Sequence, residues 1–556
     1  METSVNKALS DTHEATNLAS PLENHNTYLT DHALQEAVKR EGGDWATDSL
    51  IAFGAESGSA PRILLGVQAN ENRPVLHTHD PYGRRIDQVD FHPAYHQLWK
   101  VYRKQGIHSS PWINPKPGAH VARTAKAYLQ CLVEPGHGCP GTMTFAAVPV
   151  IKMEPSIAKT WLPLITNEHY DPRNLPIEQK KGVTMGMAVT EKQGGSDVQS
   201  NSTQAYPIGP RGSGEMYELV GHKYFVSGPM GDGSLLLAQT PEGLSCFLVP
   251  RWRPDGTKNP MQIQQLKNKM GNISNASAET ELRGAMGWLI GEEGQGLKVI
   301  LKAIALTRFD CMLGSAAGMR QAVAQATHYC QQRSAFGKNL IQQPLMQNVL
   351  ADLALESDAA LAFTMRMARA LDNAQQDEQE ALLARIGTAV GKYWVCKRTP
   401  GHAYEAMECH GGNGYMEESP MPRLYREAPV NAIWEGSGNV QALDILRAIS
   451  RTKGSMEAFI NEVTKPKGAN SIFDSFVNTL KQELSNTQDM EYRARQIAEK
   501  MGLALQASIL LQSDNQLIAD AFCLSRLNNN GYSLYGTLPK GIDCQAIVQR
   551  ACPTTC

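Results

Sequence analysis

Apolar and polar residues follow three patterns along the chain, and each pattern predicts a different kind of structure. Between residues 46 and 180 the pattern is mostly helical, interrupted by proline- and glycine-rich joints such as SSPWINPKPGAH. From about Gly182 to Gly287 short β-type runs such as YELVGHKYFVSG and LSCFLVP alternate with turn residues. This second pattern predicts a small, mostly antiparallel β domain.

After Gly296 the apolar residues return to helical spacing, beginning with Leu297, Ile300 and Ile304. Four long amphipathic stretches follow one another up to residue 450, and helices of this kind pack naturally as a bundle. Beyond Arg451 the linker-like TKPKGAN precedes two more helical stretches, around Phe473–Leu484 and Arg493–Leu511.

These patterns predict an α+β protein in five segments. The segments are an N-terminal extension (1–45), an N-terminal α domain (46–181), a middle β domain (182–287), a four-helix bundle domain (288–450) and an extra helical C-terminal domain (451–556).

Composition argues against several classes of protein. The chain has 53 lysines and arginines against 55 aspartates and glutamates, so it is not a nucleic-acid binder whose whole surface is cationic. No apolar run reaches 18 residues, and the polar start METSVNKALSDTHEATN predicts no secretory signal and no membrane partner. Eleven scattered cysteines without CxxC, and histidines without HExxH, predict a reduced, cytoplasmic protein with no structural metal.

The common phosphate-binding fingerprints GxGxxG and GxxxxGK[ST] are missing, and so is the GxSxG elbow of hydrolases. Two segments of the β domain could hold a nucleotide cofactor by other means. AVTEKQGGSD turns through two glycines, which lets backbone N–H groups approach a ring or phosphate, or it is an ordinary strand-ending turn. In GHKYFVSG, Phe225 and Ser227 share one strand face and either contact a planar ring or belong to the core.

Two segments of the helical region contain further candidate site residues. Arg333 in RSAFGK stands at a helix end and either caps carbonyls or reaches a pyrophosphate. Glu435 lies beside Trp434 in the Gly- and Ser-rich loop of APVNAIWEGSGN. In a partly dry loop its carboxylate is a candidate base with a raised pKa, and the alternative is that it caps the following helix.

In order and spacing these segments resemble the acyl-CoA dehydrogenase family over roughly residues 46–450. TEKQGGSD is similar to its TEPGxGSD signature, HKYFVSG to its QKxWITNG strand, RSAFGK to its RxxFGK motif, GGNGY to its GGxGY motif, and WEGSGNV to its YEGTxxI segment. The resemblance implies a helical domain, a β domain and a helical bundle, with FAD bound between the β domain and the bundle and an acyl-CoA or related acyl thioester as substrate.

The resemblance also implies site residues. Glu435 would remove the α-proton of the thioester, and the residue at the alternative base position of some members is Thr307 here. The chain departs from the family pattern at three places. Phe225 replaces the tryptophan that is common in the family, Ser227-Gly228 replaces Thr-Asn, and Glu408 replaces a glutamine found in many members. Arg333 and Phe336 would reach FAD across a subunit contact. The implied FAD-binding residues are Met187, Val189, Thr190, Gly195, Ser196, Phe225, Val226, Ser227, Arg333, Phe336, Ile433, Trp434, Gly436, Ser437, Gly438 and Asn439.

Nearly the whole chain, including the tail past Arg451, resembles the AidB-like branch of the family, which contains bacterial alkylation-response flavoproteins. NTYLTDHALQEAVKREGGDW, CPGTMTFA and RLYREAPVNAIWEGSGN carry this likeness. It implies a homotetramer, binding of double-stranded DNA through the tail, and protection from alkylation damage. The alternative is an ordinary metabolic dehydrogenase whose tail serves oligomerisation, and the electron acceptor is open in both.

Charge offers modest support for DNA binding, because the tail sums to only +1. Carboxylates at 444, 457 and 462 interrupt its local cationic group, so a solvated helix face competes with a DNA-binding surface, although a tetramer would bring several such groups together. The candidate DNA-binding residues are Arg447, Arg451, Lys453, Lys465 and Lys467.

Overall fold

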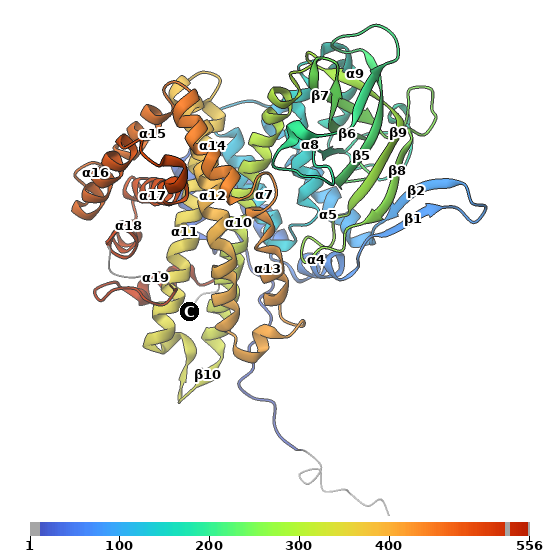
Figure 1. Cartoon of the computed structure of the whole chain (residues 1–556). Coiled ribbons are helices and arrows are strands. Elements are labelled where there is room, and N and C mark those ends of the chain that lie inside the picture. The colour runs from blue at the N-terminus through green and yellow to red at the C-terminus, as the bar shows by residue number, and fades with distance from the viewer. Residues whose placement is uncertain (1–11, 529–533, 554–556) are drawn as a thin grey trace, which may run out of the picture.

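The computed structural model describes residues 12–528 and 534–553. Helices form one side of the molecule, and a β domain with a cover of N-terminal helices forms the other (Figure 1). The N-terminal helices are α2 (His32–Arg40), α3 (Thr47–Ser57), α4 (Ala60–Glu71), α5 (Pro93–Lys104), α6 (Ser110–Ile113), α7 (Ala119–Val133), α8 (Gly138–Ile151) and α9 (Pro155–Ile165).

The β domain is one seven-stranded sheet in the order β3-β5-β4-β6-β7-β9-β8. β3 and β4 pair in parallel with β6, and all other pairings are antiparallel, which confirms the predicted β domain. Because β5 also pairs with β9, the sheet folds back on itself around a closed apolar core. Its strands are β3 (Met185–Ala188), β4 (Gln204–Pro207), β5 (Met216–Ser227), β6 (Gly233–Thr240), β7 (Gly243–Pro250), β8 (Met261–Leu266) and β9 (Ser277–Ile290).

The bundle consists of α10 (Gly296–Gln332), α11 (Pro344–Asn373), α12 (Glu378–Glu408) and α14 (Gly438–Arg451), which confirms the four helices expected from the periodicity. Short elements join them: β10 (Ser334–Ala335), β11 (Lys338–Asn339) and α13 (Met421–Glu427). Small residues let the long helices approach closely, since a Cβ on Gly391 of α12 would lie 2.2 Å from the methyl carbon of Met312 on α10.

The tail is helical, as predicted, with α15 (Ser455–Val463), α16 (Ser471–Ser485), α17 (Met490–Leu511), α18 (Gln516–Phe522) and α19 (Cys544–Ala551). Its apolar residues belong to the same buried cluster as those of the bundle, and the Trp394 indole of α12 donates a 2.9 Å hydrogen bond to Gln506 of α17. The residues beyond 451 therefore extend the bundle core. The predicted boundary at 451 is where α14 ends.

The N-terminal region is mostly helical, as predicted, but it contains one element that the pattern did not indicate. The expected helical pattern contains a β-hairpin, β1 (Val75–His79) and β2 (Arg85–Asp90), which projects from the molecule (Figure 1). The hairpin carries few buried side chains, so it lacks the apolar alternation by which a strand is recognised. No helix in the described ranges is long and apolar enough to cross a membrane.

Candidate active site

Glu435, the candidate base, lies in the loop that precedes α14. The helix begins at Gly438 with Ser437 in the N-cap position, so Glu435 does not cap it. The backbone of Glu435 is left-handed, with φ +57°, a conformation that costs a non-glycine residue free energy. Such a conformation persists only where the surroundings hold it, and the loop is held at three successive carbonyl groups.

The carbonyl of Glu435 accepts hydrogen bonds from Arg308 Nε at 2.9 Å and from Gln441 Nε2 at 3.0 Å. Arg308 is fixed in turn by Asp444, which also pairs with Arg385. The Trp434 and Gly436 carbonyls, on either side, accept from Lys392 at 2.7 and 2.6 Å. The backbone N–H of Glu435 donates to no residue in the described part of the chain.

The Glu435 carboxylate accepts a hydrogen bond of 2.6 Å from the hydroxyl of Thr307 on α10. Burial raises the pKa of Glu435 above the usual range of a glutamate, while the Thr307 hydroxyl, Arg308 and Lys392 oppose the rise. A carboxylate with a raised pKa, oriented by one donor, is suited to accept a proton near neutral pH. The prediction that Glu435 is a poised base therefore has a geometric basis.

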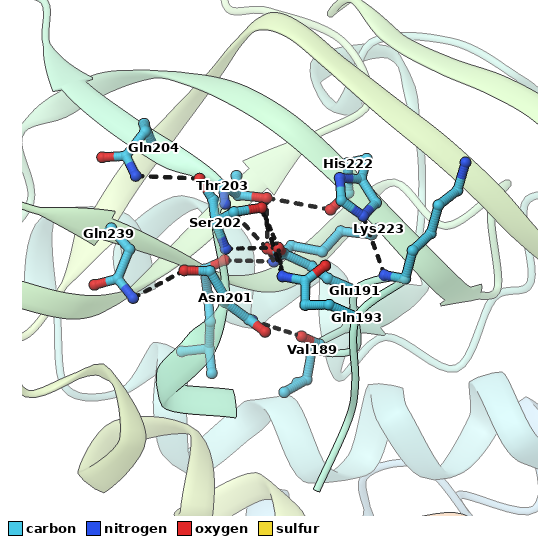
Figure 2. Close-up of polar contacts among 12 residues, drawn as sticks. Val189, Glu191, Gln193, Asn201, Ser202, Thr203, Gln204, His222, Lys223 and Gln239 are labelled. Atoms are coloured by element: carbon cyan, nitrogen blue, oxygen red, sulfur yellow. Dashed lines mark hydrogen bonds and ion pairs between the residues drawn. The ribbon is translucent and has the colours of Figure 1, made fainter. Parts of the chain in front are cut away.

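The TEKQGGSD turn is fixed by a buried ion pair that the sequence reasoning missed. The Glu191 carboxylate accepts from Lys223 Nζ at 2.7 Å, from the Thr203 hydroxyl at 2.6 Å and from the Ser202 N–H at 2.7 Å (Figure 2). Although burial opposes ionisation, Lys223 and these donors hold the pKa of Glu191 well below its usual range. Since Lys223 belongs to β5, the pair ties the turn to the strand that carries Phe225 and Ser227.

Strand pairing brings the two candidate cofactor segments together, because Met187 of β3 lies opposite Ser227 of β5. Phe225 is 44% exposed, and the ammonium of Lys267 lies 4.9 Å from the centroid of its ring. The side chain of Val226 points into the sheet core, so any contact of this residue with a ligand would be made by its main chain. Val189 is half-buried and packs against the apolar cluster that lies between the β domain and helices α8, α9 and α10.

The turn itself fits a polar, planar ligand. The hydroxyls of Thr190 and Ser196 make no hydrogen bond to another residue in the described ranges, so both are available. A Cβ on Gly195 would lie 2.6 Å from the Thr190 hydroxyl, so only glycine leaves that hydroxyl uncovered. Exposed Ser196 and Phe225 on two tied segments match the hydrogen-bonding edge and the flat face of a flavin.

Cys139 lies at the start of α8. Burial raises the pKa of its thiol to about 11; Lys269 opposes the rise, and the charge of Glu435 adds to it. No pattern in the sequence singled out Cys139.

Arg333 and Phe336 lie at the opposite end of α10 from this site (Figure 1). Thr307 and Arg333 are about 26 residues apart on one helix, or ~39 Å, which is further than one dinucleotide can span. Arg333 donates to the Asn17 carbonyl and lines a cavity of about 230 Å³ together with His410 and the Gly411–Asn413 segment. Phe336 is 99% exposed.

The remaining predicted residues fall into two groups. Ile433, Trp434, Gly436, Ser437, Gly438 and Asn439 lie in the loop that contains Glu435 or at the start of α14, which follows it. The five candidate DNA-binding cations are exposed on α14 and around α15, and only Lys465 pairs with a carboxylate there, that of Glu462.

Comparison with known proteins identifies the family. The sequence matches the model of the adaptive response protein AidB N-terminal domain over residues 17–172. It matches the acyl-CoA dehydrogenase middle domain over 186–285 and the acyl-CoA dehydrogenase C-terminal domain over 294–450. In Escherichia coli K12, the putative acyl-CoA dehydrogenase AidB is 45% identical over 522 residues, which cover 94% of this chain and 95% of that protein.

Two solved structures share the fold. ACDH-11 of Caenorhabditis elegans in complex with C11-CoA superimposes with a TM-score of 0.83 at 25% identity, over 98% of this chain and 94% of that one. An acyl-CoA dehydrogenase from Bacillus anthracis complexed with FAD gives a TM-score of 0.63 over 92% of this chain and 88% of that one, at 16% identity, which shows the fold alone. The three matched domains and the near full-length relative show that this chain belongs to the acyl-CoA dehydrogenase family, in its AidB-like branch.

Proposed function

We propose that this protein is an FAD-dependent acyl-CoA dehydrogenase that oxidises an acyl thioester between its α and β carbons. The observation that carries the proposal is the Glu435 loop, where a carboxylate with a raised pKa stands beside its own unpaired backbone N–H. A base and a hydrogen-bond donor on one residue are what removal of the α-proton of a thioester requires.

The two groups have separate roles. The Glu435 carboxylate takes the α-proton, and the hydrogen bond from Thr307 holds it in one orientation. The Glu435 N–H donates to the thioester carbonyl and stabilises the negative charge that grows on its oxygen. Bound FAD supplies the acceptor for the β-hydrogen, which leaves as hydride.

The residues that would hold FAD come from three places. Thr190 and Ser196 offer hydroxyls, Phe225 a ring face, and the loop from Ile433 to Asn439 closes the site. Arg333 and Phe336 lie too far from Glu435 to serve the same FAD, so they serve that of a second copy. Each FAD is then shared between two chains, and the assembly that we propose, which the family resemblance implies, is a homotetramer.

The substrate class follows from the chemistry of the loop and from the relative that was solved with C11-CoA. Anaerobic mixing of the holoenzyme with saturated acyl-CoA of graded chain length tests it. At least one should bleach the flavin, and Glu435→Gln should slow the bleaching by at least 10²-fold, the usual contribution of a positioned base, without loss of flavin. If no chain length bleaches the wild type, the proposal fails.

A second function, binding of double-stranded DNA in protection from alkylation damage, is favoured by one observation. Arg447, Arg451, Lys453 and Lys467 are exposed and form no ion pair with a carboxylate among the described residues. Arg447 and Arg451 stand one helical turn apart on α14, and the others lie around α15. Four copies of this group in a tetramer would give a surface able to contact phosphates.

Duplex retardation at low salt tests the DNA proposal. Arg447→Glu/Arg451→Glu should weaken binding and reduce the slope of log affinity against log salt by about 2, at ~0.9 for each phosphate that is no longer neutralised. Lys100→Glu/Lys159→Glu, which changes the same charge at exposed sites on α5 and α9, should leave the slope unchanged. Equal effects of the two pairs would refute the assignment and favour a purely metabolic enzyme.

A further inference from the structure

Lys392 on α12 is buried in a way that needs an explanation. Its side chain is 1% exposed, and no carboxylate lies within ion-pair distance of it among residues 12–528 and 534–553. Its ammonium donates instead to the main-chain carbonyls of Trp434 and Gly436, at 2.7 and 2.6 Å. Burying an ammonium without a counter-ion costs free energy, so its place beside the catalytic loop suggests a role in the reaction.

The two carbonyls that Lys392 binds flank Glu435. All described peptide bonds are trans, so the Glu435 N–H points away from the Trp434 carbonyl, on the opposite edge of the same peptide plane. Fixing that carbonyl on Lys392 therefore aims the N–H away from α12. Because this N–H has no partner in the described chain, it is a donor kept free in a fixed direction.

The other contacts of the loop do not set this direction. Arg308 and Gln441 bind the carbonyl of Glu435, which belongs to the next peptide plane, and Gln441 also binds that of Gly436 at 3.2 Å. Among the described residues, only Lys392 forms a hydrogen bond with the peptide group that contains the Glu435 N–H. Its charge also acts through that plane, since a cation on the carbonyl oxygen polarises the amide and strengthens its N–H as a donor.

We propose that Lys392 is a positioning residue that aims and polarises the Glu435 amide toward the thioester oxygen. The inference rests on the proposed function and adds to it the residue that builds the oxyanion-binding donor. A purely structural lysine would affect stability and flavin content, whereas a positioning lysine affects the acidity of the bound thioester. Removing an oxyanion-hole donor generally costs about 10²–10³-fold in rate, and misdirecting this donor should cost about 10²-fold.

The test uses the flavin-loaded full chain with two variants and a control. Lys392→Met removes the donor and the charge at similar length, Lys392→Gln keeps an N–H donor without the charge, and Lys159→Met alters an exposed lysine on α9, away from the Glu435 loop. The first readout is the limiting rate of flavin bleaching by the best acyl-CoA, with its half-saturating concentration. The second uses a 3-thiaacyl-CoA, whose α-proton can be removed although it cannot be dehydrogenated. Its enolate absorbs at long wavelength beside oxidised flavin.

Lys392→Met should bleach about 10²-fold more slowly at nearly unchanged half-saturation, and the pH at which the enolate band appears should rise by about two units, the same 10²-fold. Lys392→Gln should fall between Met and wild type, and Lys159→Met should match wild type. If Lys392→Met does not fold, Lys392→Gln decides alone, and wild-type values for it overturn the inference. A wild type that no acyl-CoA bleaches refutes the proposed function, and the enolate band then still tests Lys392.

Discussion

The hydroxyl of Thr307 donates a 2.6 Å hydrogen bond to the carboxylate of Glu435, 128 positions further along the chain. Thr307 stands where some relatives are expected to carry their base. In this chain the residue at that position donates a hydrogen bond to Glu435, the other candidate base. Two helices of the bundle thus contribute to the proposed proton-transfer site, α10 through Thr307 and α14 through the loop before it.

Replacing Thr307 should change the pH dependence of the reaction. The hydroxyl stabilises the ionised carboxylate, so Thr307→Val should raise the pKa of Glu435 further. Since only the ionised form accepts a proton, the rising limb of the bleaching rate should move to higher pH by about one unit, the scale of a hydrogen bond to a charged group. Single-turnover rates across pH measure this. Thr307→Ser keeps a hydroxyl and should leave the limb in place, and an unmoved limb in Thr307→Val would contradict the assigned role.

Breaking the Glu191–Lys223 pair should loosen the flavin turn. Glu191→Gln leaves the buried Lys223 ammonium without its counter-ion, which should cost about 3 kcal/mol and reduce the flavin bound per chain. The pKa of Glu191 is held low in the fold, so the stabilisation is present at neutral pH and is lost as the pH falls below the ordinary glutamate range. The difference in the free energy of unfolding between wild type and Glu191→Gln should therefore be smaller at acidic pH than at pH 7.

The double variant Glu191→Gln/Lys223→Met should recover part of the stability, because it removes both charges. Lys192→Met, on an exposed side chain of the same turn, serves as the control. Equal flavin content in Glu191→Gln and the control would show that the pair does not shape the turn.

Arg366 should hold the tail on the bundle. From α11 it binds Glu462 of α15 at 2.6 Å and Glu380 of α12 at 2.8 Å. Although burial opposes ionisation, Arg366 lowers the pKa of Glu462, so Arg366→Met should cost about 3 kcal/mol at pH 7.5. At lower pH the Glu462 carboxylate of the variant, no longer paired with Arg366, takes up a proton, and the loss should become smaller. Thermal unfolding at pH 5.5 and 7.5 measures the loss of stability and its dependence on pH. Arg451→Met, on an exposed side chain, is the control. An equal loss of stability at the two pH values would contradict the expectation.

Phe336 should mark a contact between subunits. It is 99% exposed on the turn between β10 and β11, and its left-handed backbone, with φ +53°, tolerates aspartate. Phe336→Asp should therefore fold but give a smaller particle with less flavin, measured by light scattering and absorbance. Tyr82→Asp, 83% exposed at the tip of the β1–β2 hairpin, should change neither quantity. An unchanged mass for Phe336→Asp would remove Phe336 from the interface.

The order of helical and β-type segments determined the architecture, because burial of one face imposes a period of 3.6 or 2 on the sequence. The motifs TEKQGGSD, HKYFVSG and WEGSGN also located the turn, the strand and the loop that border the site. The β1–β2 hairpin was missed because its mostly exposed faces leave no such period. The pairing of Phe225 with Ser227 on one face followed from strand geometry alone, whereas the burial of Val226 between them became clear only in the sheet.

Which charged and polar groups meet was decided by the tertiary structure alone. The sequence contains 53 lysines and arginines, and nothing in its periodicity says that Lys392 binds the carbonyls beside Glu435 or that Lys223 binds Glu191. Local propensity and patterning act over one turn or one strand, while these contacts join groups far apart in the chain. They form only when packing has excluded water and each buried donor must find an acceptor. The sequence by itself therefore singled out the proposed base, and the fold determined what orients it.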